Sequence, residues 1–133
     1  MTRREIDLPQ LGTVLPHYAQ AVARGDLLFI SGMLAVDREQ RLVGEGDVVA
    51  QTAKIFDSMK TILEHAGASP ADVLKVTIYL TDMADRPKIT PLRQQFFAPS
   101  RPASTLVAVS ALAVPGAVIE IEAVAGLPRP LSA

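Results

Sequence analysis

Two glutamates separated by one residue are the first candidates for chemistry in this sequence. Glu120 and Glu122 stand in the run Ile119-Glu120-Ile121-Glu122-Ala123, where acidic and apolar residues alternate as in a strand. Residues two apart on a strand share one face of a sheet. A carboxylate near a cleft serves as a general acid or base when burial raises its pKa. Taken alone, the pattern fits either such a group at Glu120 or a solvated strand residue, and for Glu122 we favour a structural ion pair.

Other residue types and the overall charge argue against several other chemistries. The chain has no cysteine and only two histidines, which are far apart in the sequence, so we expect no metal site. No Gly-rich phosphate loop is present, and Ser31 lacks the G-x-S-x-G pattern of a hydrolase nucleophile. The formal charge is −1, and the two Tyr and four Phe are not interleaved with basic residues. We therefore expect no cofactor and no nucleic-acid partner.

The elements that must hold these residues begin with a predicted hairpin. Tyr18 to Ala23 forms one strand, Arg24-Gly25-Asp26 the turn, and Leu27 to Ser31 the second strand. The second strand is apolar without alternation up to Ile30, which predicts a central strand buried on both faces. Three further strands are predicted at Val73 to Thr81, Ser104 to Leu112 and Ala117 to Ala125.

Two helices are predicted between these strands. Apolar residues recur every three or four positions from Val49 to Ala66, and Gly67 follows where a terminating glycine belongs; they are Val49, Ala53, Phe56, Met59, Leu63 and Ala66. Ser69 to Asp72 predicts one short helical turn. Thr90-Pro91 is typical of a helix start, with the helix running to about Phe97. This order predicts one α+β domain over residues 1–133, with both helices on one face of the sheet.

The remaining features of the chain concern its surroundings. The N-terminal residues lack the apolar stretch of a signal peptide, and no apolar run approaches the roughly 18 residues that span a bilayer. We expect no membrane association and a cytoplasmic location, which the absence of cysteine suits. Apolar residues other than glycine make up 49% of the chain, and with glycine added the share is slightly above that of a usual soluble domain. We expect part of this excess to lie at a subunit interface.

Five segments in register resemble the RidA/YjgF family. They are Tyr18-Ala19-Gln20-Ala21-Val22, Leu28-Phe29-Ile30-Ser31-Gly32, Phe96-Phe97, Arg101-Pro102-Ala103 and Ile119-Glu120-Ile121-Glu122-Ala123-Val124-Ala125. The resemblance covers nearly the whole chain. It implies a chorismate-mutase-like fold with a mixed sheet, a homotrimer, and small-molecule clefts between subunits. Typical members hydrolyse reactive enamines and imines to keto acids and ammonia; the ribonuclease activity sometimes attributed to the family finds no support in the charge pattern.

The resemblance also assigns roles to individual residues. Glu120 matches the family's acid, which orients or activates water, and with this match we favour a catalytic role for it. Tyr18 matches a pocket tyrosine, and the alternative is a half-buried aromatic residue. Ser31 and Gly32 match a pocket Ser-Gly where a main-chain donor meets an oxyanion, and the alternative is an ordinary strand end. His17 departs from the family pattern and is either a titrating group beside Tyr18 or a surface histidine.

Ser104 marks the largest departure from the family. In typical members an arginine after Pro-Ala holds the substrate carboxylate, whereas here Pro102-Ala103 is followed by Ser104. Either Ser104 stands in the place of the arginine, or the arginine is deleted and Ser104 matches the residue after it. Arg101 and Arg93 are candidate replacement cations, and the alternative is that both are solvated surface residues. The sequence thus predicts a hydrolytic deaminase of an enamine, imine or aminomuconate-like compound that uses Glu120. The alternative is a non-catalytic ligand-binding or regulatory trimer, for which the missing arginine is the main evidence.

Overall fold

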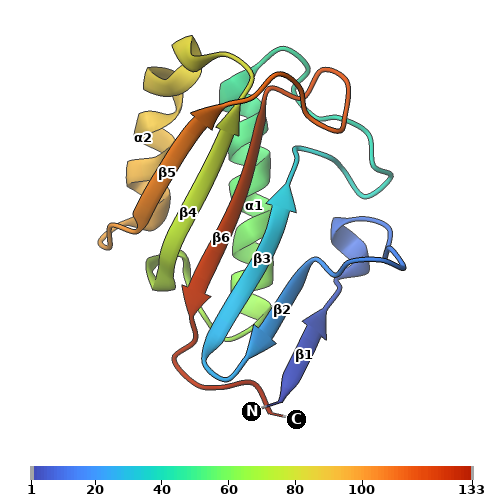
Figure 1. Cartoon of the computed structure of the whole chain (residues 1–133), viewed down its shortest axis with the longest axis vertical. Coiled ribbons are helices and arrows are strands. Elements are labelled where there is room, and N and C mark those ends of the chain that lie inside the picture. The colour runs from blue at the N-terminus through green and yellow to red at the C-terminus, as the bar shows by residue number, and fades with distance from the viewer. Residues whose placement is uncertain (1, 133) are drawn as a thin grey trace.

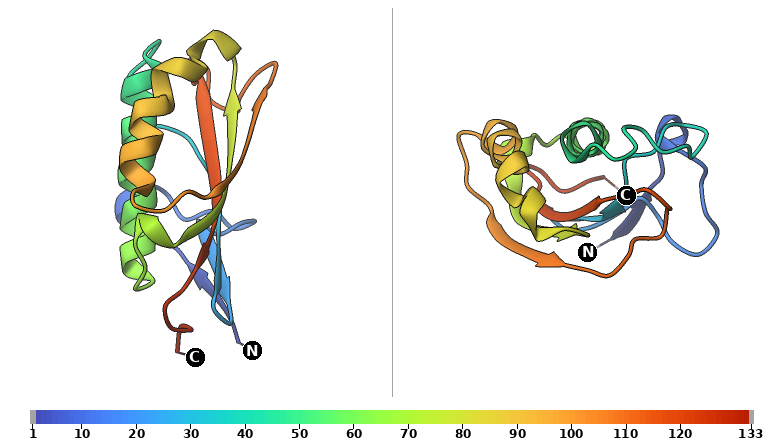
Figure 2. Two further views of the ribbon diagram at one scale, coloured as in Figure 1. Left: turned by 90° about the vertical axis from the view of Figure 1, so that its left-hand side faces the viewer. Right: turned by 90° about the horizontal axis from the view of Figure 1, so that it is seen from above.

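The computed structural model describes residues 2–132 and shows a six-stranded mixed sheet with two helices against one face (Figures 1 and 2). The predicted α+β class is confirmed. The strands are β1 (Arg3–Ile6), β2 (Ala21–Arg24), β3 (Leu27–Met33), β4 (Val73–Leu80), β5 (Ala103–Ala108) and β6 (Ile119–Gly126). The helices are α1 (Val48–His65) and α2 (Arg86–Phe97), and short 3-10 turns cover Pro9–Leu11, Pro70–Asp72 and Met83–Asp85.

The strands follow the order β1-β2-β3-β6-β4-β5 across the sheet. All neighbours are antiparallel except β4 and β5, which are parallel and joined through α2. The C-terminal strand β6 therefore lies in the middle of the sheet, between β3 and β4 (Figure 1). This order places Glu120 at the centre of the sheet and Ser104 on an edge strand.

The predicted hairpin is present, but its second strand is not buried on both faces. Strand β3 is third of the six strands, as expected of a central strand. Leu28 and Ile30 are buried under the helices, whereas Phe29 on the other face is 49% exposed. The apolar run reflects a second face that nothing in this single chain covers. Strand β1 was not predicted, because its residues are polar except for the buried Ile6.

Helix α1 lies within one residue of its prediction. The Asp47 carboxylate accepts a hydrogen bond of 3.0 Å from the Ala50 N–H at the N-terminus, and Gly67 adopts a φ of +79° just beyond the C-terminus. The buried face is rotated from the predicted one. Val49 and Ala53 are exposed, and the buried polar residues Gln51 and Thr52 lie against the core instead.

Helix α2 begins earlier than predicted. It starts at Arg86, with Pro87 in its first turn, and Pro91 lies inside it. Pro87 therefore occupies the place that the pattern rule assigned to Pro91, and Pro91 leaves one carbonyl of the preceding turn without its usual donor. Strand β5 is shorter than predicted and stops at Ala108, because its neighbour β4 ends opposite it at Leu80.

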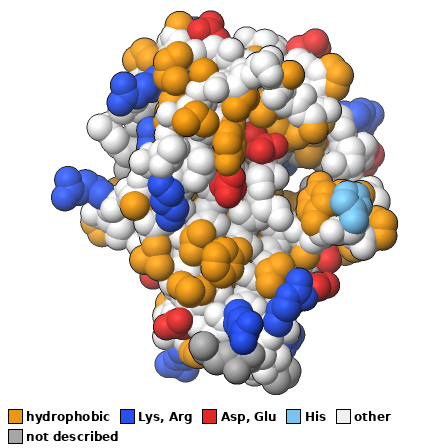
Figure 3. Space-filling model, viewed as in Figure 1, with side chains coloured by type: hydrophobic (Ala, Val, Ile, Leu, Met, Phe, Trp, Pro, Cys, Tyr) orange, Lys and Arg blue, Asp and Glu red, His pale blue; other side chains and the backbone are white. Residues whose placement is uncertain are grey.

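A register shift alters the face of strand β4. The pairing with β6 is irregular between Val73 and Lys75. Regular alternation along the strand would bury Leu74 together with Val76, but Leu74 is 53% exposed and Val73 is buried in its place. Apolar side chains gather on this uncovered face of the sheet (Figure 3); the exposed ones include Leu27, Phe29, Leu74 and Val107.

Candidate functional site

Glu120 projects from the uncovered face of strand β6. It lies opposite Tyr79 of β4, while its neighbours Ile119 and Ile121 point into the core under the helices. Partial burial, and next the charge of Glu122 on the same strand face, raise the pKa of Glu120 above the usual range of a glutamate. A carboxyl whose pKa moves toward neutrality is suited to take up and release protons at physiological pH.

A bulge in strand β3 brings the Ser-Gly pair to this carboxylate. The pairing of β3 with β6 shifts between Ile30 and Met33, so Ser31 and Gly32 leave the regular ladder. A methyl group added at Gly32 would lie 2.7 Å from Glu120 Oε2. Glycine at this position thus lets the carboxylate lie directly against the backbone.

Ser31 holds the loop that forms one wall of the site. Its hydroxyl donates a hydrogen bond of 2.7 Å to the Ala19 carbonyl, and its N–H donates one of 2.9 Å to the Gln20 carbonyl. Both groups are therefore engaged with residues 19 and 20. The contribution of Ser31 visible in the structure is to fix the segment that carries Tyr18.

Tyr18 and His17 occupy different positions relative to the site. Tyr18 lines the cavity and is 54% exposed, so its ring forms part of an open wall. His17 contacts the Tyr18 ring edge to face, with ring centroids 4.9 Å apart, but it is exposed and does not line the cavity. Its position fits the surface alternative better than a direct role.

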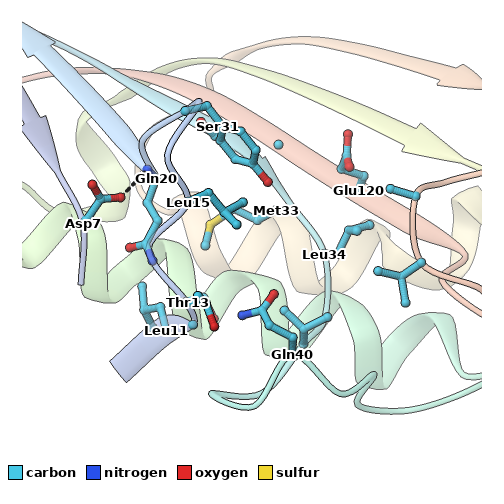
Figure 4. Close-up of a pocket in the computed structure, with 17 residues that line it drawn as sticks. Asp7, Leu11, Thr13, Leu15, Gln20, Ser31, Met33, Leu34, Gln40 and Glu120 are labelled. Carbon is cyan, nitrogen blue, oxygen red and sulfur yellow. Dashed lines mark hydrogen bonds between the residues drawn. The ribbon is translucent and has the colours of Figure 1, made fainter. Parts of the chain in front are cut away.

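These residues enclose a cavity of about 250 Å³ (Figure 4). Four of the predicted site residues lie together in its wall: Tyr18, Ser31, Gly32 and Glu120. Thr13 and Gln40 lie across the cavity from Ser31 (Figure 4). The cavity is large enough for a small organic molecule.

Several lining residues were not predicted as site residues. Asp7 accepts a hydrogen bond of 3.1 Å from the Gln20 N–H, and the Gln20 side chain bonds both main-chain groups of Leu8 at 2.9 and 3.1 Å. These contacts hold in place the loop that lines one side of the cavity. Gln20 lies in the segment from Tyr18 to Val22 that resembles the RidA/YjgF family, so the sequence could have indicated it as a site residue. Gln40, with a φ of +66°, has no such sequence pattern around it.

Ser104 and Arg101 lie elsewhere in the chain. Ser104 pairs with the buried Val76 and so faces the helix side of the sheet, opposite to the face that carries Glu120. Its hydroxyl accepts a hydrogen bond from Arg93 Nη2 on α2. Arg101 lines a small cavity beside Phe97 and Pro102, which Arg93 also lines. Within one chain the predicted site residues thus form two groups.

Across residues 2–132, no group of three or more His, Cys, Asp or Glu side chains is arranged to hold a metal ion. Neither helix in this part of the chain is long and apolar enough to cross a membrane.

Comparison with known proteins identifies relatives over nearly the whole chain. Residues 12–127 match the family model described as Endoribonuclease L-PSP. A RutC family protein of Pyrococcus abyssi is 40% identical over 81% of this chain and 84% of its own. The 3-aminoacrylate deaminase RutC of Acinetobacter baylyi is 39% identical over 92% of this chain and 97% of its own. The crystal structure of RidA from a Psychrobacter species covers 93% of this chain and 99% of its own, with a TM-score of 0.84 and 32% identity.

Proposed function

Because this chain belongs to the RidA/YjgF family, whose relatives share its fold and its length, we propose that it is a hydrolytic deaminase of a small enamine or imine. The observation that carries this proposal is the position of Glu120. Its carboxylate lies against the Gly32 backbone in a cavity that Tyr18 also lines, and its pKa is raised. The relative from Acinetobacter, named a 3-aminoacrylate deaminase, supports a small enamine as the substrate class.

The proposed reaction needs only a carboxylate and water. The enamine first tautomerises to the imine, and water then adds to the imine carbon. Glu120 removes a proton from the attacking water and delivers a proton to the nitrogen. The carbon–nitrogen bond breaks as the carbon–oxygen bond becomes a carbonyl, which releases ammonia and a carbonyl product. The balance is one water consumed for each ammonia formed, and no cofactor is required.

The uncovered sheet face supports assembly into the homotrimer that we propose. Phe29 lies opposite Val124, Leu27 lies opposite Gly126, and the Leu74 side chain lies beside Gly126. Apolar side chains gathered on an open sheet face mark an interaction site. Glu120 and Ser104 lie on opposite faces of one chain. In such a trimer we expect Glu120 of one copy to face Ser104 of a neighbouring copy, which forms a cleft between the two subunits.

Ammonia release tests the proposed function. The purified protein is incubated with freshly generated 2-aminoacrylate and, separately, with 3-aminoacrylate, and ammonia is measured against the uncatalysed rate. We expect acceleration with at least one compound, and a loss of about 10²- to 10⁴-fold in the rate of ammonia release in Glu120→Gln.

The second candidate function is that of a non-catalytic ligand-binding or regulatory trimer, which Ser104 in place of the family arginine favours. Absence of acceleration with both compounds supports this second candidate. The cytoplasmic location stays a prediction that cell fractionation tests.

A further inference from the structure

Two arginines on helix α2 face a cavity without a carboxylate partner. Arg86 and Arg93 are seven residues apart, which places them two turns apart on one side of the helix. They line a cavity of about 530 Å³ together with Met83, Ser104 and Leu106. Within residues 2–132 neither forms an ion pair with an Asp or Glu, although four other basic residues there do.

The surroundings of Arg93 leave its charge uncompensated. Partial burial, and next the neighbouring charge of Arg86, lower the pKa of Arg93 below its usual range. Both effects disfavour the charged form of Arg93, whereas an anion beside the guanidinium favours it. An unpaired, partly buried guanidinium costs free energy that a bound carboxylate offsets.

Ser104 orients this guanidinium. Arg93 Nη2 donates a hydrogen bond to the Ser104 hydroxyl oxygen from across the gap between α2 and β5. A neutral hydroxyl fixes the direction of the side chain without neutralising it. A guanidinium has five N–H donors in a planar fork, so one bond to Ser104 leaves donors for a bidentate contact.

We propose that Arg93, oriented by Ser104 and supported by Arg86, binds the carboxylate of the substrate in this chain. The inference rests on the proposed function, because it supplies the anion contact of the same reaction. It also defines the substrate class: an enamine or imine that carries a carboxylate, as both aminoacrylates do.

The geometry requires two copies of the chain for this contact. Ser104 lies on the helix side of edge strand β5, and Glu120 lies on the uncovered side of β6. A small substrate held by Arg93 of one copy therefore reaches Glu120 only on a neighbouring copy. Arg101 shares with Arg93 a second cavity beside Phe97, but it does not line the cavity that holds Ser104 and Arg86. Among the described residues the guanidinium that bonds Ser104 is that of Arg93, so we assign the anchor to Arg93 and not to Arg101.

Calorimetric titration with pyruvate at low salt tests the carboxylate contact without turnover. Pyruvate is the keto acid that 2-aminoacrylate yields and is itself not consumed. We expect Arg93→Gln to weaken pyruvate binding by about 10- to 100-fold and Ser104→Ala by about 2- to 10-fold. Arg101→Gln is the matched control and is expected to bind as the unmodified protein does. Unchanged pyruvate binding in Arg93→Gln overturns the inference.

A rescue variant distinguishes loss of the carboxylate contact from loss of the folded structure. Ser104→Arg placed in the Arg93→Gln background supplies a guanidinium from strand β5, and we expect it to recover pyruvate binding. Pyruvamide, which lacks the negative charge, is expected to bind all variants alike. Inorganic phosphate is the second anion, and tighter binding of phosphate than of pyruvate at the same residues overturns the assignment to a carboxylate.

The two proposals fail in different ways. If pyruvate binding depends on Arg93 but no ammonia is released, the anion site stands and the deaminase proposal fails. If ammonia is released and Arg93→Gln keeps the full kcat/KM, the deaminase proposal stands and the anion site fails.

Discussion

Tyr79 donates its phenolic hydrogen to the Glu122 carboxylate, which ties strand β4 to strand β6 on the uncovered face of the sheet. Glu122 is thereby held two residues from Glu120 on that same face. The contact raises the pKa of Tyr79, because the bonded carboxylate disfavours the phenolate. It also corrects the expectation of an ion pair for Glu122, whose partner in the structure is a phenol.

The first prediction concerns this neighbouring charge. Glu122→Gln removes a negative charge that contributes to the raised pKa of Glu120. We expect the acidic limb of the pH profile of kcat/KM to move to lower pH, because Glu120 then loses its proton more readily. The profile is measured by ammonia release across the acidic range. An unmoved limb would mean that a group other than Glu120 is responsible for it.

The second prediction uses the close approach at Gly32. In Gly32→Ala the new methyl group meets Glu120 Oε2 at 2.7 Å, so the carboxylate must move aside while the fold remains. We expect kcat to fall by about 10²-fold, the scale of a displacement near 1 Å, with little change in the melting temperature. The control combines Gly32→Ala with Glu120→Gln. If the methyl group acts through the carboxylate, the double variant loses no more activity than Glu120→Gln alone.

The third prediction follows from the raised pKa of Glu120 in the folded protein. As the pH rises, the unfolded chain releases this proton before the folded protein does, so the free energy of unfolding falls between the two pKa values and stays lower above them. Glu120→Gln removes this penalty. We expect the variant to be more stable than the unmodified protein at pH 7, and the difference to vanish below the unfolded pKa.

Urea unfolding from about pH 3.5 to pH 8 measures this difference, at one protein concentration because assembly contributes to stability. Glu45→Gln, at an exposed glutamate outside the cavity, is the matched control and is expected to show no such pH dependence. If Glu120→Gln is more stable than the unmodified protein by the same amount at both ends of this pH range, the ionisation of Glu120 is not the cause of the gain.

Sequence patterns predicted much of the fold because most elements depend on local signals. The period of α1, its terminating Gly67 and the hairpin turn at Gly25 act over a few residues each. Strand β1 and the bulge at Val73 depend on pairing with distant strands, which no local pattern reveals. The start of α2 was wrong because two prolines, Pro87 and Pro91, both satisfy the same rule.

The candidate site was predictable only in part for a related reason. Glu120, Tyr18, Ser31 and Gly32 were found through the family resemblance, and the structure brings them to one cavity. The contact of Arg93 with Ser104 joins a helix to a strand and depends on where α2 lies over the sheet. Sequence reasoning named both residues but had no means of choosing between Arg93 and Arg101.

The fourth prediction addresses the uncovered sheet face. Phe29 is 49% exposed at the centre of this face, opposite Val124 of the neighbouring strand. In the proposed homotrimer we expect its ring to be buried, so Phe29→Glu would place a charge in an apolar interface, where an unpaired charge is strongly unfavourable. We expect the variant to sediment as a monomer. Val49→Glu, at an exposed apolar residue in the first turn of α1, leaves the sheet face untouched and is expected to remain a trimer.

Because the carboxylate contact and Glu120 lie on opposite faces of one chain, the monomeric Phe29→Glu should also lose ammonia release. A monomer with full activity would place the complete site within one chain and contradict the intersubunit cleft.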